Sequence, residues 1–255
     1  MSQWFVDRVA IVTGGASGIG LAVASKLLSL GVQLAVVDRD GSALQGAFGG
    51  VDKVLKIEAD VSDRIQVERY VSTCLDRFGR IDMFHNNAGL LGPRAPLLDF
   101  TDEDYHSLFD VNVLGSLLGL QAVAKAMKAS SGGSIVNTAS AVGLRSVADH
   151  GLYGATKATV LRITQQAAAE LGQFNIRVNA VAPGSVDTPA LRSSLKGTSE
   201  DGGEVDRRVS RQLRKRPLGL PITADDVADL VLWLLGPASS KITGSINVID
   251  GGVLT

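Results

Sequence analysis

The amino-acid sequence predicts an α/β fold with one doubly wound sheet of about seven mostly parallel strands and helices on both faces. Short, uninterrupted apolar runs recur along the chain, as expected of strands that are buried on both sides of a parallel sheet. Helical apolar periodicity occurs between these runs, and this alternation is typical of the fold class. No repeat, low-complexity tract or linker divides the 255 residues, so we expect a single domain over residues 1–255.

The expected elements follow each other with few interruptions. The strands are predicted at residues 9–12, 34–37, 54–57, 81–85, 134–138, 176–181 and 245–249. The helices are predicted at residues 19–30, 63–78, 101–127, 153–172 and 224–236, and Gly31 and Gly79 suit the ends of the first two. Residues 187–221 are polar with weak periodicity, which predicts a long loop or lobe that covers a ligand.

Composition and charge limit the classes of function. A net charge of −1 and a pI of about 6.3 give no general attraction to nucleic acid or to an anionic membrane. Cys74 is the only cysteine, so no intrachain disulfide can form, which suits a reducing compartment. We find no signal peptide and no apolar run of roughly 18 residues. These features predict a soluble cytoplasmic protein, and we expect no metal site.

A glycine-rich turn joins the first predicted strand to the first helix. Glycines allow a tight turn and a close approach of the backbone to a pyrophosphate, and the free N–H groups of a helix N-terminus favour an anion. The strand–helix–strand frame makes nucleotide binding a stronger interpretation than packing alone. The candidate contacts in this turn are Gly14, Ser17, Gly18, Ile19 and Gly20.

Asp38 ends the second predicted strand, 18 residues after Gly20. A carboxylate at this position can accept both ribose hydroxyls of an adenosine and repels a 2′-phosphate, which predicts NAD rather than NADP. Arg39 leaves a second interpretation open, because a guanidinium can hold a 2′-phosphate. We prefer a solvated loop arginine at this position.

Polar and small residues follow the third and fourth predicted strands. Asp60, which precedes Val61, could accept the adenine amino group or cap the next helix, a role for which Asp63 competes. The amides of Asn86 and Asn87 can join neighbouring strand ends, while Ala88 and Gly89 leave space for a flat ring or a ribose. His85 is interpreted as a core-facing strand residue.

An acid–base group is predicted after the fifth strand. Ser140 stands at the end of that strand, and Tyr153 and Lys157 are four residues apart on a predicted helix, so they share one face. Asn112 lies within the predicted helix over residues 101–127, where asparagine is mildly unfavourable. A local kink or a side-chain contact would explain it.

These motifs stand in order along almost the whole chain: Thr13-Gly14-x-x-x-Gly18-Ile19-Gly20, Asp60-Val61, Asn86-Asn87-Ala88-Gly89, Asn112, Ser140, Tyr153-x-x-x-Lys157 and Pro183-Gly184. Together they resemble the short-chain dehydrogenase/reductase family, with its Rossmann-like fold. This combination of motifs is specific for the fold and the reaction type, but it does not indicate the substrate. The chain is similar to NAD-dependent members that act on secondary alcohols, cyclic ketones or sugars, and also to 3-oxoacyl-carrier-protein reductases, which usually lack an acid at the position of Asp38.

The resemblance implies a mechanism of NAD-dependent alcohol oxidation or carbonyl reduction. Tyr153 would be the general acid or base, and Ser140 would hold the substrate oxygen. A free phenol has a pKa of about 10, and Lys157 together with the positive nicotinamide would lower it. Lys157 would also reach the nicotinamide ribose, and the Asn112 side chain would position a water that relays the proton.

The resemblance also implies further contacts and partners. Val186 and Thr188 would contact the carboxamide and the pyrophosphate, and the Pro183-Gly184 turn would make room for the cofactor. Substrate-facing residues would be Val142, His150 and Leu191, although we prefer an exposed loop histidine for His150. A homotetramer is expected, with interfaces from residues 112–127 and 153–172 and from the last helix and strand.

Three alternatives stay open beside this reading. A thioester-reducing enzyme dependent on NADPH is disfavoured by Asp38. A redox-sensing scaffold that binds NAD(H) without turnover is disfavoured by the presence of Asn112, Ser140, Tyr153 and Lys157. The charged run in the polar stretch is interpreted as a solvated or intersubunit helix in preference to a surface that attracts an anionic substrate; it comprises Glu200, Asp201, Glu204, Asp206, Arg207, Arg208, Arg211, Arg214, Lys215 and Arg216.

Overall fold

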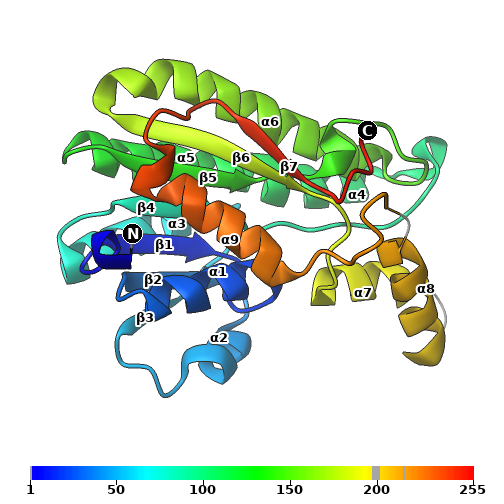
Figure 1. The fold of residues 1–255 in the computed structure, drawn as a ribbon, viewed down its shortest axis with the longest axis horizontal. Coiled ribbons are helices and arrows are strands. Elements are labelled where there is room, and N and C mark those ends of the chain that lie inside the picture. Colours follow the sequence, from blue (N-terminus) through cyan, green and yellow to red (C-terminus); the bar gives the residue numbers. More distant parts are fainter. Residues whose placement is uncertain (1, 197–201, 215) are drawn as a thin grey trace.

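A seven-stranded parallel sheet forms the centre of the computed structural model, which describes residues 2–196, 202–214 and 216–255. The strands are β1 (Val9–Thr13), β2 (Gln33–Asp38), β3 (Val54–Glu58), β4 (Met83–Asn86), β5 (Gly133–Thr138), β6 (Ile176–Pro183) and β7 (Ile246–Ile249). Their order is β3-β2-β1-β4-β5-β6-β7, and every pairing is parallel (Figure 1). The predicted fold class is confirmed.

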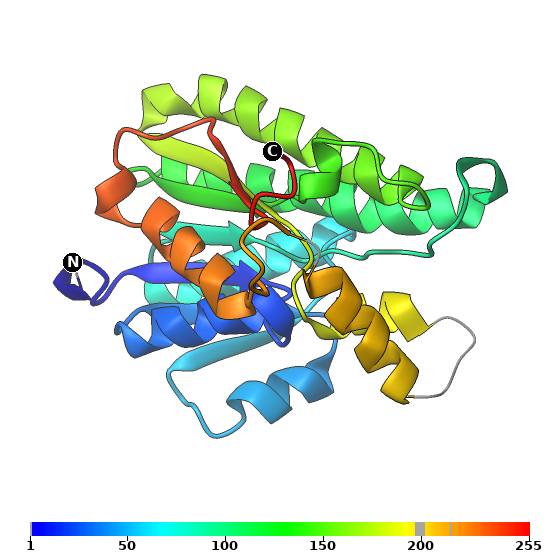
Figure 2. The ribbon, with the colours of Figure 1, turned by 45° about the vertical axis from the view of Figure 1, so that its right-hand side comes forward.

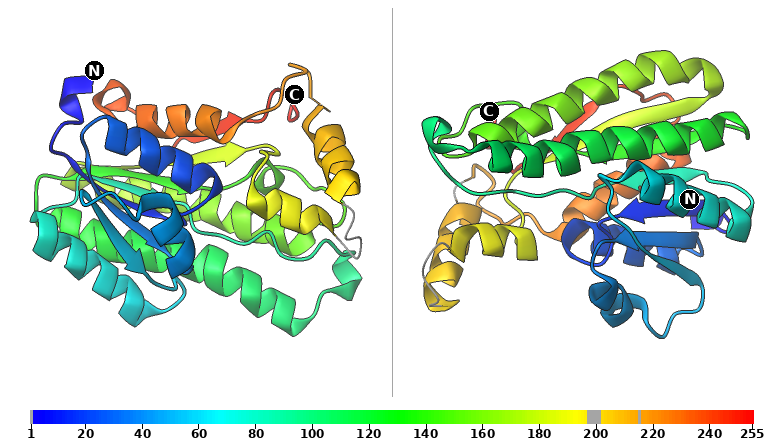
Figure 3. Two further views of the ribbon diagram at one scale, coloured as in Figure 1. Left: turned by 90° about the horizontal axis from the view of Figure 1, so that it is seen from below. Right: turned by 180° about the vertical axis from the view of Figure 1, so that it is seen from behind.

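Helices cover both faces of the sheet (Figure 3). On one face, α1 (Gly18–Ser29) and α9 (Ala224–Leu235) bury residues such as Val23 and Val231 against alternate strand residues, among them Val12 and Val36. On the other face, α3 (Arg64–Phe78), α5 (Ser116–Lys128) and α6 (Gly151–Leu171) pack on a second cluster that includes Phe84. Strands buried on both sides explain the uninterrupted apolar runs of the sequence.

The strand order reverses between β1 and β4, which follow each other in the sheet but not in the chain. In a doubly wound sheet, the crevice at this reversal and at the carboxyl ends of the strands is where ligands bind. The turns after β1 and β4 therefore face a common space, and Figure 1 shows α7 and α8 beyond the same ends of the strands.

The structure differs from the expected elements at the start of the fourth strand and after the second. The fourth strand begins at Met83 rather than at residue 81. The buried Asp82 carboxylate just before it accepts the backbone N–H of Val9 and pairs with Arg8 and Arg80. A helix that the sequence did not indicate, α2 (Gly41–Phe48), follows β2; Asp40 caps it by accepting from the Ala43 N–H. It is short and contains two glycines, so its periodicity is weak.

The predicted helix over residues 101–127 is interrupted at Asn112. Its parts are α4 (Asp102–Phe109), a π-helical segment (Asp110–Gly115) and α5. The stretch Asp102–Lys128 is also long and apolar enough to cross a membrane, contrary to our expectation, but half of its most apolar window is buried inside the fold. Since α5 packs on α3 and on the sheet, a core helix accounts for its apolar character.

The predicted loop over residues 187–221 is largely helical in the described residues. It contains α7 (Pro189–Lys196) and α8 (Gly202–Arg214), which Figure 2 shows side by side. Leu191 and Leu195 of α7 pack on Val205 and Val209 of α8 in a small separate cluster. Of the charged run, Glu200, Asp201 and Lys215 lie outside the described residues. We use the name lobe for residues 187–221.

We expect the lobe to lose its order independently of the main core, because its apolar cluster is separate. Leu195→Ala removes a buried side chain, a change that typically costs about 2–5 kcal/mol. It should accelerate amide hydrogen exchange in α7 and α8 while leaving the global melting temperature almost unchanged. The matched change Leu234→Ala in α9 should lower the melting temperature of the whole protein. A global loss of stability in Leu195→Ala would contradict the independence of the lobe.

Candidate active site

A cavity of about 530 Å³ lies at the carboxyl ends of the strands. Almost all residues singled out in the sequence border it, although they come from turns that are far apart in the chain. They are Gly14, Ser17, Gly18, Ile19, Asp38, Arg39, Asp60, Val61, Asn87, Ala88, Gly89, Ser140, Val142, His150, Tyr153, Lys157, Pro183, Gly184, Val186, Thr188 and Leu191. Gly20 and Asn112 do not border it, and neither do Asn86 and His85.

The glycine-rich turn after β1 forms one wall of the cavity. Gly14 and Gly18 have positive φ angles of 62° and 53°, which side chains other than glycine rarely adopt. Gly20 lies behind the turn, where a Cβ atom would come within 2.0 Å of the Gly14 carbonyl oxygen. The Ser17 side chain does not cap α1, so the first N–H groups of this helix stay available to an anion.

Asp38 and Asp60 border the end of the cavity that lies after β2 and β3. The Asp38 carboxylate accepts the backbone N–H groups of Ala16 (3.0 Å) and Asp40 (3.1 Å), which fixes it beside the glycine turn. Asp60 accepts from Ser62, and the helix cap is Asp63, so capping of α3 by Asp60 was the wrong alternative.

The residues after β4 join neighbouring strands, as expected. The Asn87 side-chain amide donates to the Thr13 carbonyl (3.0 Å), and Asn86 donates to Asn137 on β5 (3.0 Å). His85 is fully buried and lies outside the cavity, with Nε2 2.9 Å from the Thr138 hydroxyl oxygen. Burial lowers the pKa of His85 to about 3, which keeps it neutral and supports its interpretation as a core residue.

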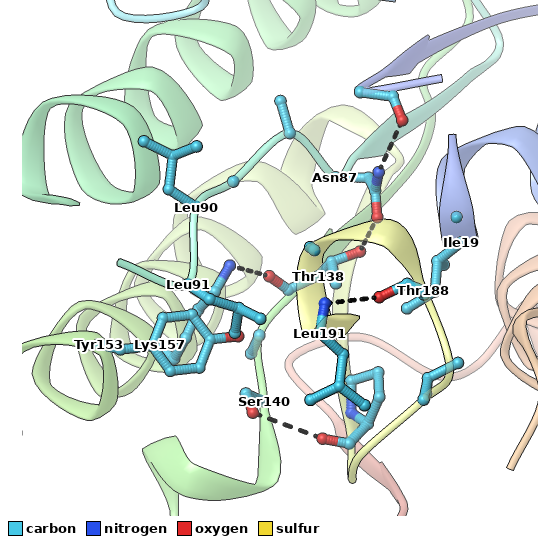
Figure 4. Close-up of a pocket in the computed structure, with 18 of the residues that line it drawn as sticks. Ile19, Asn87, Leu90, Leu91, Thr138, Ser140, Tyr153, Lys157, Thr188 and Leu191 are labelled. Carbon is cyan, nitrogen blue, oxygen red and sulfur yellow. Dashed lines mark hydrogen bonds between the residues drawn. The ribbon is translucent and has the colours of Figure 1, made fainter. Parts of the chain in front are cut away.

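Ser140, Tyr153 and Lys157 meet on the opposite wall (Figure 4). Lys157 is 4% exposed, and its ammonium donates to the Thr138 carbonyl at 2.9 Å. The same ammonium lies 5.8 Å from the centre of the Tyr153 ring. Thus a phenol, an ammonium and a hydroxyl share one wall of the cavity.

Burial acts on the two titrating groups in opposite directions. It raises the pKa of Tyr153 to about 12, against the effect of its hydrogen bond with Ser140. It lowers the pKa of Lys157 to about 8. Both shifts favour the uncharged form, so in the absence of other charges Tyr153 is a phenol at neutral pH.

Asn112 supports the site from behind. Its Oδ1 atom accepts from the Leu90 N–H (2.7 Å), and its Nδ2 atom donates to the Leu90 carbonyl (2.8 Å) and to Thr156 (3.1 Å). A Cβ atom on Gly89 would lie 3.0 Å from Asn112 Oδ1 and 3.2 Å from Lys157 Nζ. The expected water-holding side chain is therefore engaged with the backbone after β4, and the interruption at Asn112 has its reason in this contact.

His150 differs from our preference for an exposed loop residue. It is half-buried, precedes α6, pairs with Ala95 in an isolated bridge and borders the cavity. Sequence reasoning missed other lining residues, among them Leu91, Arg94, Arg145, Val147 and Val253. They carry no motif, and only the fold brings their segments to the cavity. Arg216 differs from its interpretation as part of a solvated charged run, because it is 7% exposed and borders the cavity.

The arrangement fits a nicotinamide dinucleotide. The glycine turn leaves room and N–H groups for a pyrophosphate, Asp38 stands where a ribose would lie, and Lys157 and Tyr153 stand at the other end. Among the described residues, no group of three or more His, Cys, Asp or Glu could hold a metal ion.

Comparison with known proteins agrees with this geometry. Residues 14–254 match a family model described as enoyl-(acyl carrier protein) reductase. The chain is 37% identical to the levodione reductase of Leifsonia aquatica, over 97% of this chain and 94% of the relative. It is also 37% identical to a diacetyl reductase, (S)-acetoin forming, of Staphylococcus aureus, over 97% of this chain and 98% of the relative.

Solved structures show the same likeness in three dimensions. A crystal structure of levodione reductase superposes with a TM-score of 0.92 at 36% identity, covering 97% of both chains. A crystal structure of NAD⁺-bound xylitol dehydrogenase superposes with a TM-score of 0.88 at 31% identity, covering 97% of this chain and 99% of the other.

The lowered pKa of Lys157 predicts a pH dependence of stability. Between pH of about 8 and 10.5 the unfolded chain binds a proton at this lysine that the folded protein does not, so the free energy of unfolding rises with pH over this window. The rise should be on the order of 3 kcal/mol. Denaturant titrations of wild type and Lys157→Met should show it as a pH-dependent difference between the two proteins. A constant difference from pH 7 to 10 would contradict the shift.

Proposed function

The chain belongs to the short-chain dehydrogenase/reductase family, and on that premise we propose that it is an NAD-dependent alcohol dehydrogenase or carbonyl reductase. It transfers a hydride between NAD(H) and a secondary alcohol or ketone. The observation that carries this proposal is the meeting of Ser140, Tyr153 and Lys157 at one end of a cavity whose other end holds Asp38. The relatives act in the same class: two are named as reductases of diketones and one as a polyol dehydrogenase.

The functional groups of Ser140 and Tyr153 determine their roles in the proposed reaction. The Ser140 hydroxyl holds the substrate oxygen, and Tyr153 gives a proton to that oxygen in reduction or takes it in oxidation. When bound, the nicotinamide supplies or accepts the hydride at the substrate carbon. Because burial raises the pKa of Tyr153 to about 12, the phenol holds its proton at neutral pH and is ready to act as an acid.

Lys157 makes the reverse direction possible. Its ammonium, 5.8 Å from the Tyr153 ring centre, stabilises the phenolate electrostatically. The Thr138 carbonyl holds this ammonium in place at 2.9 Å. Lys157 also borders the cavity, where its ammonium would reach the nicotinamide ribose, and Asn112 holds the Leu90 backbone next to Gly89.

Asp38 supports NAD as the cofactor. Its carboxylate borders the cavity next to the glycine turn, where it can accept ribose hydroxyls and repel a 2′-phosphate. The other residues that we assign to the cofactor are Gly14, Ser17, Gly18, Ile19, Asp60, Val61, Asn87, Ala88, Gly89, Pro183, Gly184, Val186 and Thr188. Val142, His150 and Leu191 are assigned to the substrate.

We also propose a domain organisation, a location and an oligomeric state for the protein. We take residues 1–255 as one catalytic domain whose lobe covers the substrate, in a soluble cytoplasmic protein. A homotetramer is supported by large apolar side chains that stay exposed on the two expected surfaces. These are Leu114 beside α5, and Trp233 and Val248 on α9 and the edge strand β7.

Tyr153→Phe should abolish turnover while NADH binding survives. Loss of the proton donor typically lowers the rate by about 10²–10⁴-fold, and the ring that fills the wall is kept. Steady-state assays with secondary alcohols and diketones, together with NADH fluorescence titration, measure the two effects separately. Near-normal turnover in this variant would show that Tyr153 is not the acid or base.

Asp38→Ala should shift the cofactor preference toward NADP. Removal of charge-assisted hydrogen bonds to the ribose should weaken NAD by about tenfold or more, while the repulsion of a 2′-phosphate disappears. The kcat/KM ratio for NAD and NADP measures the shift. Asp76→Ala removes the same charge from an exposed position on α3 and serves as the control. Equal ratios in the wild type and both variants would refute ribose recognition by Asp38.

A further inference from the structure

Carboxylates border the cavity at only one of its ends among the described residues. They are Asp38, the last residue of β2, and Asp60, which follows β3, and Arg39 borders the cavity at the same end. The part of the wall that follows β4 to β7 carries basic residues instead, and no Asp or Glu borders it among the residues that the structure describes. Besides Lys157, these basic residues are Arg94, Arg145, His150 and Arg216.

Arg216 is the most unusual of these basic residues. It is 7% exposed, and its Nη2 atom donates to the Ser185 carbonyl at 2.8 Å. Its Nε and Nη1 atoms are enclosed and have no hydrogen-bond partner within the described part of the chain. A buried guanidinium with unused donors is costly, because water no longer solvates these N–H groups.

The nearest carboxylate does not complete the hydrogen bonding of Arg216. Burial lowers the pKa of Arg216, and Asp250 opposes part of this lowering electrostatically. However, the Asp250 oxygens accept the N–H groups of Gly252 (2.7 Å) and Leu254 (2.9 Å), and no ion pair joins Asp250 to Arg216 in the described residues. Within the described residues, Asp250 thus leaves two N–H groups of Arg216 without an acceptor, in a residue that borders the cavity.

The surroundings of Arg216 place it beside the carboxyl ends of β6 and β7. Ser185 follows β6, and a Cβ atom on Gly251, which follows β7, would lie 2.8 Å from Arg216 Cδ. The same C-terminal segment contacts a second basic residue, because Arg145 donates to the Val253 carbonyl at 3.2 Å. Arg145 follows β5, on the same side as Ser140 and Tyr153.

Two further basic residues come from the segments beside α6. The bridge between Ala95 and His150 brings the loop after β4 against the start of this helix. Arg94, next to Ala95, interacts electrostatically with Asp149, next to His150. Since His150 stands three residues before Tyr153, these groups surround the reacting end of the cavity rather than the nucleotide end.

We propose that this part of the cavity is a subsite for an oxyanion on the substrate, with Arg216 as its central cation, so that the substrate is a hydroxy acid or keto acid, or the corresponding sulfonate or phosphate. This inference rests on the proposed function for the position of the reacting carbon. A guanidinium binds a carboxylate through two parallel N–H bonds, and the arginines around it make a field that favours one negative charge.

The test compares ketones that differ only in charge. Wild-type enzyme with NADH is assayed on 4-oxopentanoate and 5-oxohexanoate and on the uncharged amides of both. We expect kcat/KM for at least one acid to exceed that of its amide by about tenfold or more, the usual effect of a charge-assisted hydrogen bond. Arg216→Met should lower this ratio by about ten- to a hundredfold through the KM of the acid, with the NADH dissociation constant unchanged.

Matched variants separate the subsite from general effects. Arg145→Met, at an exposed position on the other side of the C-terminal segment, should lower the ratio in the same direction even if Arg216→Met perturbs folding. Arg64→Met removes a charge from the exposed start of α3 and should leave the ratio unchanged. Weaker NADH binding in Arg216→Met would assign this arginine to the cofactor pyrophosphate and overturn the proposal.

A binding measurement distinguishes failure of the subsite from failure of the proposed reaction. Calorimetric titration of the Tyr153→Phe enzyme with bound NADH should show that the acids bind more tightly than their amides, and that Arg216→Met removes the difference. This result would support the subsite even if the wild type reduced none of these ketones. Equal binding of acids and amides, or an equal loss of both in Arg216→Met, would refute it.

Discussion

A line of hydrogen bonds through Asn87 and Thr138 joins the two ends of the candidate active site (Figure 4). The Asn87 amide donates to the carbonyls of Thr13 and Gly14, while its oxygen accepts from the Thr138 hydroxyl. The carbonyl of Thr138 in turn holds the Lys157 ammonium. The glycine turn after β1 and the lysine on α6 are thereby fixed relative to each other across three strands.

The same line explains the buried His85. The Thr138 hydroxyl has one hydrogen, and Asn87 Oδ1, which can only accept, takes it. Thr138 must then accept from His85, so Nε2 carries the proton and Nδ1, which has no partner among the described residues, is unprotonated. Burial favours a neutral imidazole ring, in agreement with the strongly lowered pKa of His85. His85 therefore fixes the orientation of Thr138 although it does not border the cavity.

The sequence predicts this protein well where a residue type has one dominant physical use. Gly14 and Gly18 require positive φ, and Tyr153 and Lys157 share a helix face, so their placement could be inferred from spacing. It predicts poorly where a role depends on distant partners. Nothing beside Asn112 in the chain indicates that Leu90 is its partner, and nothing near Arg216 indicates Ser185. The four residues of the lobe cluster are split between two helices, which hides their periodicity in the sequence.

The basic lining and the raised pKa of Tyr153 act on each other. Burial alone would make the phenolate hard to form, and the positive field of Lys157 and its basic neighbours opposes that effect. An oxyanion bound beside Arg216 would cancel part of this field and raise the pKa of Tyr153 again. The proton would then stay on the phenol, where it is needed to protonate a ketone oxygen. A subsite that recognises an anion would therefore also change how readily Tyr153 gives up its proton, because recognition and acid strength depend on the same charges.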